Sequence, residues 1–184
     1  MSKGKRVELY IEGETVVVTL VLFKNVTNGK TLLDITDERN PYDCAEDGVR
    51  PFFLLMNSQL VFNENHILHS IYRGIYNFKT KKKITKNVML EIFFFMSPHE
   101  NMTECLTQYK VKSDTKSLIY VGINVSDEEV RTFTSLVEGE EADLEEISTL
   151  RDDEKIGHIF KCTDMQNLER YIYHNVASKK VNLN

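Results

Sequence analysis

The stretch LLMNSQLVFNENHILHSIYRGI, residues 54–75, predicts an apolar β-strand followed closely by an amphipathic helix. Residues 52–56 are all apolar, which favours a buried strand. Asn63 is a typical N-cap residue, and apolar residues recur after it at spacings of three and four, which predicts a helix over residues 64–78. Strands and helices do not alternate strictly along the rest of the chain, so an α+β fold is favoured.

Toward the N-terminus, residues 16–23 read VVVTLVLF and predict a second strand. Because these residues are almost entirely apolar and many are β-branched, we expect both faces of this strand to be buried. Residues 28–35 fit either a turn or a short helix. Residues 37–50 contain Asn, Pro, Asp and Gly, which are typical of a surface loop. Residues 1–15 are expected to form an N-terminal extension or an edge strand.

Toward the C-terminus, residues 88–96 read VMLEIFFFM and leave two alternatives open. The adjacent phenylalanines favour a strand, whereas Asn87 as a cap and Glu91 in the first turn favour a helix. Residues 117–125 predict another strand. Further helices are expected to begin at four polar residues that can cap a helix, which are Asn101, Ser126, Asp153 and Thr163.

These segments predict one α+β domain over residues 16–179, followed by a tail at residues 180–184. The domain should contain a small mixed or antiparallel sheet of three to four strands, packed with about six helices. A chain of 184 residues with 41% hydrophobic content is long enough to bury a core of this kind.

Composition limits the function and the location of the protein. The formal net charge is -5, so any contact with RNA must come from a local basic patch. The three cysteines form no C-x-x-C pair, which argues against a structural zinc site and for a reducing compartment. Neither a signal peptide nor a membrane span is recognisable. We therefore expect a cytoplasmic and nuclear protein that does not contact a membrane.

Motifs for catalysis are missing from the sequence. It contains no phosphate-binding glycine loop, no nucleophile elbow and no H-E-x-x-H zinc motif. His66 and His69 could share a metal and Cys105 could be a nucleophile, but partly packed side chains and a buried thiol are the simpler interpretations. The acidic stretch at residues 127–154 is interpreted as a solvated face. We therefore expect no catalytic residue, no metal and no cofactor.

One basic cluster stands out in this acidic chain. Lysines meet phosphates and tyrosines can stack on unpaired bases, so the cluster could bind RNA, with Tyr72 and Tyr76 nearby. It could equally be a basic helix end that complements the helix dipole. Its members are Arg73, Lys79, Lys81, Lys82, Lys83 and Lys86.

Several segments together resemble the TPRKB family, the small kinase-binding subunits of the KEOPS (EKC) complex. The block LEIFFFMSPHENMTECLTQYKVKSDTKSLIYVGI, residues 90–123, carries the strongest resemblance, because it combines a Glu among apolar residues, Met-Ser-Pro, a short helix and a strand. The other similar segments are residues 18–33, 54–75, 136–147 and 155–162. No single motif is diagnostic, but the order and spacing of the five segments argue against a chance resemblance. One departure is Tyr109-Lys110, where the family usually has Phe-Gly.

The resemblance implies a non-catalytic protein that binds the kinase/ATPase subunit of KEOPS and, through it, the remaining subunits. It also implies a role in holding the CCA end of tRNA during threonylcarbamoyladenosine modification, and it favours a helix at residues 88–96. A small cytosolic enzyme and a stand-alone RNA-binding module are the alternatives.

The resemblance further implies where the kinase subunit binds. Kinase contacts are expected on the short helix after Pro98 and on the C-terminal helix, although the sequence does not separate interface from core there. The candidates are Met102, Leu106, Tyr109, Leu168 and Ile172. Contacts with tRNA are expected from the six members of the basic cluster.

Overall fold

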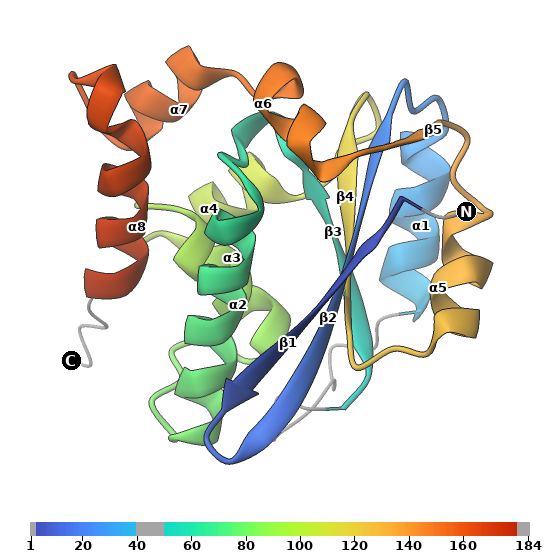
Figure 1. The fold of residues 1–184 in the computed structure, drawn as a ribbon, viewed down its shortest axis with the longest axis horizontal. Coiled ribbons are helices and arrows are strands. Elements are labelled where there is room, and N and C mark those ends of the chain that lie inside the picture. Colours follow the sequence, from blue (N-terminus) through green and yellow to red (C-terminus); the bar gives the residue numbers. More distant parts are fainter. Residues whose placement is uncertain (1–2, 40–49, 180–184) are drawn as a thin grey trace.

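A computed structural model describes residues 3–39 and 50–179 of the chain. The described part forms one antiparallel sheet in the order β1-β2-β4-β3, with the short β5 also paired to β2 (Figure 1). The α+β prediction is confirmed, and β5 has no counterpart among the predicted strands. The strands are β1 (Lys5–Ile11), β2 (Glu14–Lys24), β3 (Phe52–Asn57), β4 (Leu118–Ile123) and β5 (Glu140–Ala142).

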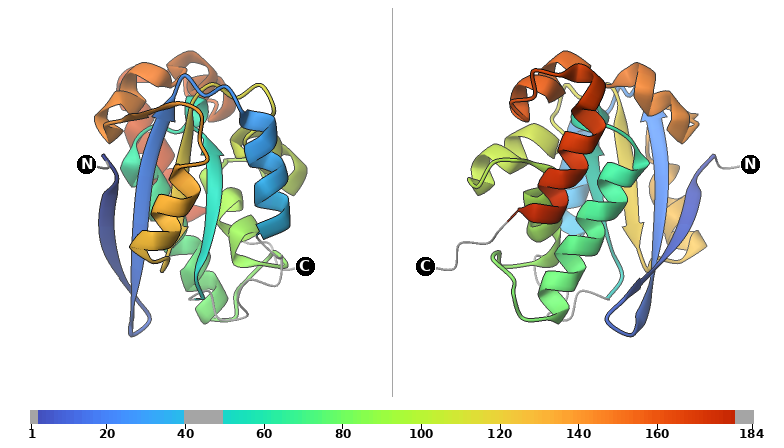
Figure 2. Two further views of the ribbon diagram at one scale, coloured as in Figure 1. Left: turned by 90° about the vertical axis from the view of Figure 1, so that its right-hand side faces the viewer. Right: turned by 60° about the vertical axis from the view of Figure 1, so that its left-hand side comes forward.

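Helices cover both faces of the sheet. Figure 2 shows α1 and α5 on one face and α2, α3 and α8 on the other. No helix in the described ranges is long and apolar enough to cross a membrane. The helices are α1 (Gly29–Arg39), α2 (Glu64–Lys79), α3 (Val88–Met96), α4 (Met102–Tyr109), α5 (Asp127–Thr134), α6 (Ile147–Leu150), α7 (Asp153–Ile159) and α8 (Leu168–Ser178), with 3-10 turns at Ser58–Leu60, Leu144–Glu146 and Met165–Asn167.

Strand β2 is the centre of the sheet, and its residues 20–23 are all apolar because both faces of the sheet are covered there. Leu20 and Leu22 point into the larger core, which includes side chains of α2, α3 and α8. Val21 and Phe23 point into the smaller core beneath α1 and α5. The prediction of a strand buried on both faces is therefore confirmed for this half of β2.

Helix α3 resolves the ambiguity at residues 88–96 in favour of a helix. Asn87 caps it, since its side chain accepts a hydrogen bond from the Leu90 amide at 2.9 Å. A helix that is apolar all round must be buried all round, and most of α3 is. It crosses α2 at Gly74, where a Cβ would lie 2.9 Å from a side-chain carbon of Ile92. Tertiary packing thus overrides the strand propensity of the phenylalanines.

The helix starts were predicted with mixed success. Ser126 and Asn101 cap α5 and α4 as expected. The start predicted for α7 was wrong by one residue, and α8 begins at Leu168, later than predicted, because residues 165–167 form a 3-10 turn. Asp152 caps α7, and Asp164 accepts from the Gln166 amide in the 3-10 turn before α8.

The segment between the first helix and β3 was predicted to be a loop over residues 37–50. Helix α1 continues to Arg39, three residues into that range. Residues 40–49 lie outside the described residues, as do residues 180–184 of the predicted tail.

Candidate interaction surfaces

The five candidate kinase contacts separate into two groups. Tyr109, Leu168 and Ile172 are at most 2% exposed and belong to the larger core. Met102 and Leu106, on α4, are only partly buried. The sequence could not make this distinction, because an apolar stripe on a helix looks the same whether it packs on its own core or on a partner.

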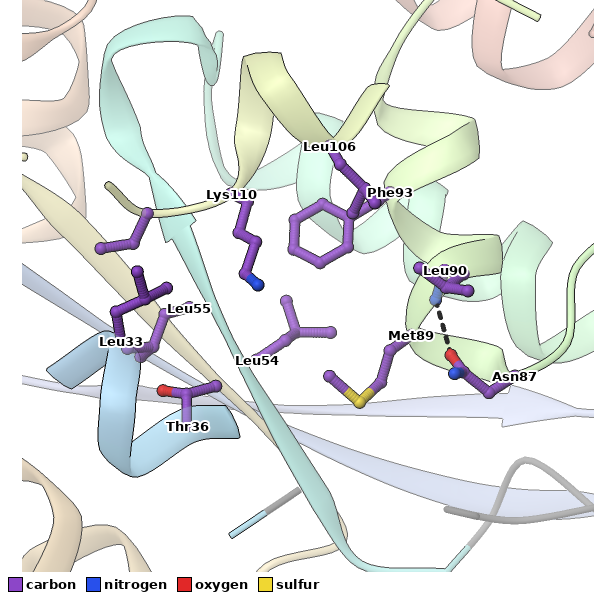
Figure 3. A pocket seen from close by; sticks show the side chains of 11 residues that line it. Leu33, Thr36, Leu54, Leu55, Asn87, Met89, Leu90, Phe93, Leu106 and Lys110 are labelled. Atoms are coloured by element: carbon purple, nitrogen blue, oxygen red, sulfur yellow. Dashed lines mark hydrogen bonds between the residues drawn. The ribbon is translucent and has the colours of Figure 1, made fainter. Parts of the chain in front are cut away.

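Leu106 adjoins an apolar pocket of about 270 Å³ between α1, β3, α3 and α4 (Figure 3). Two of its polar side chains already have partners inside the protein: the Thr36 hydroxyl donates to the Leu32 carbonyl, and Asn87 caps α3. The pocket is therefore suited to an apolar group. It is lined by Leu33, Thr36, Leu54, Leu55, Asn87, Met89, Leu90, Phe93, Leu106, Lys110 and Val111.

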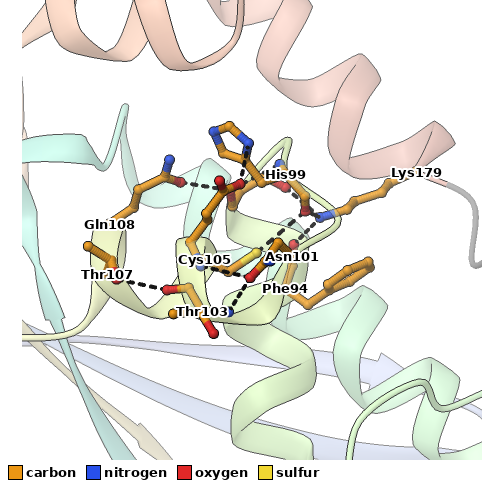
Figure 4. Close-up of polar contacts among 10 residues, drawn as sticks. Phe94, His99, Asn101, Thr103, Cys105, Thr107, Gln108 and Lys179 are labelled. Carbon is orange, nitrogen blue, oxygen red and sulfur yellow. Dashed lines mark hydrogen bonds and ion pairs between the residues drawn. The ribbon is translucent and has the colours of Figure 1, made fainter.

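A polar cluster fixes α4 to its neighbours (Figure 4). The Asn101 side chain caps the helix, and the Ser97 hydroxyl donates to the Gln108 side chain at 2.7 Å. The Cys105 thiol donates to the His99 carbonyl, and burial raises the pKa of this thiol. A buried, protonated thiol of this kind is structural and unsuited to nucleophilic chemistry.

Lys179, at the end of α8, was not singled out from the sequence. Its ammonium donates to the carbonyl oxygens of Phe94, Ser97 and His99 at 2.5, 2.7 and 2.6 Å (Figure 4). Burial lowers the pKa of Lys179 to about 8. The contact ties α8 to the end of α3 and to the loop that leads into α4.

His66 and His69, considered above as a possible metal pair, have separate roles. His66 is fully buried; its Nδ1 accepts from the Phe62 amide, and its Nε2 lies 2.9 Å from the Met96 carbonyl oxygen. Burial lowers the pKa of His66 to about 4, so it is neutral at pH 7. His69 packs edge-on against Tyr173. Within residues 3–39 and 50–179, no group of three or more His, Cys, Asp or Glu side chains could hold a metal.

Two members of the basic cluster are committed to contacts inside the protein. The Arg73 guanidinium donates to the carbonyl oxygens of Ala177 and Lys179, at the C-terminal end of α8. Lys79 forms an ion pair with Glu14 at 2.8 Å. Both residues therefore support neighbouring elements, and neither presents a charge as openly as the lysines that follow.

The remaining four lysines, Lys81, Lys82, Lys83 and Lys86, are exposed. They lie on residues 80–86, which join α2 to α3 and are called the lysine loop below. Just before it, the rings of Tyr72 and Tyr76 stack on each other with centroids 6.2 Å apart. The loop thus concentrates four positive charges directly after a helix that carries two stacked tyrosine rings.

Comparison with known proteins places this chain. The model of the family described as kinase binding protein CGI-121 matches residues 23–180. The chain belongs to the CGI-121 family. The description of this family is that of a kinase-binding protein. The predicted family is therefore confirmed, and so is the prediction of a non-catalytic protein.

CGI-121 relatives share about a quarter of their residues with this chain. The EKC/KEOPS complex subunit CGI121 of Candida glabrata is 25% identical over 170 residues, which cover 90% of each protein. The subunit of the same name from Candida albicans is 26% identical over 81% of this chain and 68% of its own length. The EKC/KEOPS complex subunit TPRKB of Danio rerio is 25% identical over 82% of this chain and 81% of its own length.

Proposed function

We propose that this chain is a subunit of a KEOPS/EKC complex that binds the kinase subunit and helps to bring tRNA to the complex for threonylcarbamoyladenosine modification. The family description supports the kinase-binding part of this proposal, and the names of the relatives support membership of the complex. The exposed lysine loop supports the tRNA part. We expect the protein to act in the cytoplasm and the nucleus.

The kinase-binding surface is proposed to be α4 together with the pocket beside it. Met102 and Leu106 are the predicted contacts that the core leaves partly exposed. Stable interfaces commonly place an apolar anchor of one partner in a pocket of the other. The pocket under Leu106 could receive such an anchor, because its lining is largely apolar and its Thr36 and Asn87 side chains are already paired.

The tRNA-binding surface is proposed to be the lysine loop. A chain with a formal net charge of -5 repels a polyanion as a whole, so binding needs a local excess of positive charge. Lys81, Lys82 and Lys83 are consecutive and exposed. Tyr72, on α2 before the loop, has 40% of its surface exposed. This combination suits a single strand such as the CCA end, which offers phosphates and unpaired bases.

The direct test is co-expression of the chain with the kinase subunit of its own organism. We expect a stable complex that survives size-exclusion chromatography and binds tRNA more tightly than the kinase subunit alone. If the two proteins elute separately at micromolar concentration, the kinase-binding proposal is wrong for this chain. If they elute together but tRNA binding does not increase, only the tRNA part fails.

A further inference from the structure

The buried carboxylate of Glu91, on α3, faces the lysine loop. Glu91 has no exposed surface. Its Oε2 accepts a hydrogen bond from the Thr85 amide at 2.9 Å and lies 2.7 Å from the Thr85 hydroxyl, whose oxygen is also 2.8 Å from the Asn87 carbonyl oxygen. The Ile84 amide lies 3.2 Å from both carboxylate oxygens, and the Asn77 side-chain amide donates to Oε1 at 3.3 Å.

A buried carboxylate is costly unless several donors satisfy it. All four donors here are neutral groups, and three of them belong to Ile84 and Thr85, within the lysine loop. The carboxylate therefore keeps all of its donors only while these two residues keep their present backbone conformation. Conversely, the loop is held at its C-terminal side by the charge of Glu91.

The N-terminal side of the loop is fixed by the end of α2. The Lys82 amide donates to the Asn77 carbonyl at 2.8 Å and the Lys81 amide to the Phe78 carbonyl at 3.2 Å. This is the bond pattern of a Schellman motif, with Lys81 in the left-handed conformation at φ 58°. Asn77 serves both sides, because its backbone accepts from Lys82 and its side chain donates to Glu91.

We infer that Glu91 is a positioning residue for RNA binding: its carboxylate holds the lysine loop in the conformation that presents the lysines to solvent as one surface. This inference rests on the proposed tRNA-binding role of the loop. A preformed backbone loses less conformational freedom on binding than a flexible one, so the lysines bind a strand more tightly than they would on a free loop.

Replacing Glu91 by Gln tests the inference, because the amide keeps the shape but removes the charge and places an NH2 group among donors. We expect a folded protein that still binds the kinase subunit but exchanges the Ile84 and Thr85 amide hydrogens much faster. Its affinity for an unmodified tRNA transcript should fall about tenfold, the effect of about 1.4 kcal/mol, with a shallower salt dependence.

A matched pair at Thr85 gives an independent test, and it decides the question if the Glu91→Gln variant fails to fold. Thr85→Val removes the hydroxyl donor at constant shape, whereas Thr85→Ser keeps it. We expect Thr85→Val to loosen the loop and weaken tRNA binding, and Thr85→Ser to resemble the wild type in both measurements.

The outcomes separate this inference from the proposed function. If changing Lys81, Lys82 and Lys83 to Ala weakens tRNA binding but a loosened loop does not, Glu91 is only structural and the inference is overturned. If the triple variant also binds tRNA like the wild type, the proposed function of the loop has failed. If loop exchange is unchanged in both the Glu91→Gln and Thr85→Val variants, the carboxylate does not hold the loop.

Discussion

The ammonium of Lys179 donates a hydrogen bond to the carbonyl oxygen of Ser97 at 2.7 Å, across 82 residues of sequence. The same ammonium caps the carbonyl of Phe94 in the last turn of α3, where the helix dipole is negative. The backbone carbonyl of Lys179 in turn accepts from Arg73 of α2. One residue at the end of α8 therefore joins three helices and sets the position of the loop before α4.

We expect Lys179→Met to destabilise the fold by about 2–3 kcal/mol, because three carbonyl groups lose a charged donor while the side chain stays buried. Urea unfolding measures this change. Lys112→Met, at an exposed position, is the control and should change the free energy of unfolding by less than about 0.5 kcal/mol. If the two variants are equally stable, the three hydrogen bonds only compensate for burying the ammonium.

We expect Leu106→Arg to weaken kinase binding at least about tenfold while leaving the melting temperature within a few degrees of the wild type, because this side chain is only partly buried. Thr107→Arg, on the exposed side of the same helix, is the matched control and should bind normally. Ile172→Arg should instead unfold the protein, since Ile172 has no exposed surface. Calorimetry measures the melting temperature of each variant, and titration with the kinase subunit measures its affinity. Normal kinase binding by the Leu106→Arg variant would show that α4 is not part of the interface.

We expect the protein to lose stability as the pH falls from about 6.5 to about 4, because His66 stays neutral in the folded state and binds a proton in the unfolded state. The folded pKa is the lower one, so unfolding takes up a proton in this window. The contribution of His66 to this loss is about 3 kcal/mol. Urea unfolding at a series of pH values measures it. A His69→Gln variant should keep the same pH dependence, and a flat profile in the wild type would contradict the burial of neutral His66.

Local signals predicted those elements whose ends are set by their own side chains. Strand β2 and helix α2 follow from apolar patterns and from the Asn63 cap, which accepts from the His66 amide as expected. The short β5 escaped prediction because its three residues form a strand only through pairing with β2. Its sequence, Glu-Glu-Ala, carries no strand signal of its own.

The candidate sites were less predictable, because a side chain's role depends on what lies opposite it. Tyr109 and Leu106 were both predicted as kinase contacts on one short helix, yet only Tyr109 is fully buried. Arg73 was grouped with the lysines by charge, but α8 brings carbonyl groups within its reach. Glu91 is the single acidic residue in the apolar segment 88–96. Such a residue is expected to be buried with hydrogen-bonding partners, but the sequence does not identify those partners.

We expect the simultaneous change of Lys81, Lys82 and Lys83 to Ala to weaken tRNA binding and to flatten its dependence on salt. Each lysine that neutralises a phosphate on a single strand contributes a slope of about -0.7 in log affinity against log salt concentration. Binding measured between low and physiological salt tests this. Kinase binding should survive, and removal of the CCA end from the tRNA should reproduce most of the loss. If the triple variant keeps both the affinity and the slope, the loop is only a solvated helix end.

Lys81 separates the stability of the loop from its charge. Its backbone is left-handed at φ 58°, at the position after a helix where Gly is preferred because a Cβ is unfavourable there. Lys81→Gly should therefore stabilise the fold by up to about 1 kcal/mol, whereas Lys81→Ala should not, because Ala keeps the Cβ. Both variants lose the same charge, so both should weaken tRNA binding by a similar factor.

Thermal unfolding measures the stability of the two variants, and titration with tRNA measures their affinity. If Lys81→Gly is more stable and binds tRNA as tightly as the wild type, the lysine at this strained position has no role in RNA binding. If it is more stable and binds less tightly, the strain is retained because the charge is needed there.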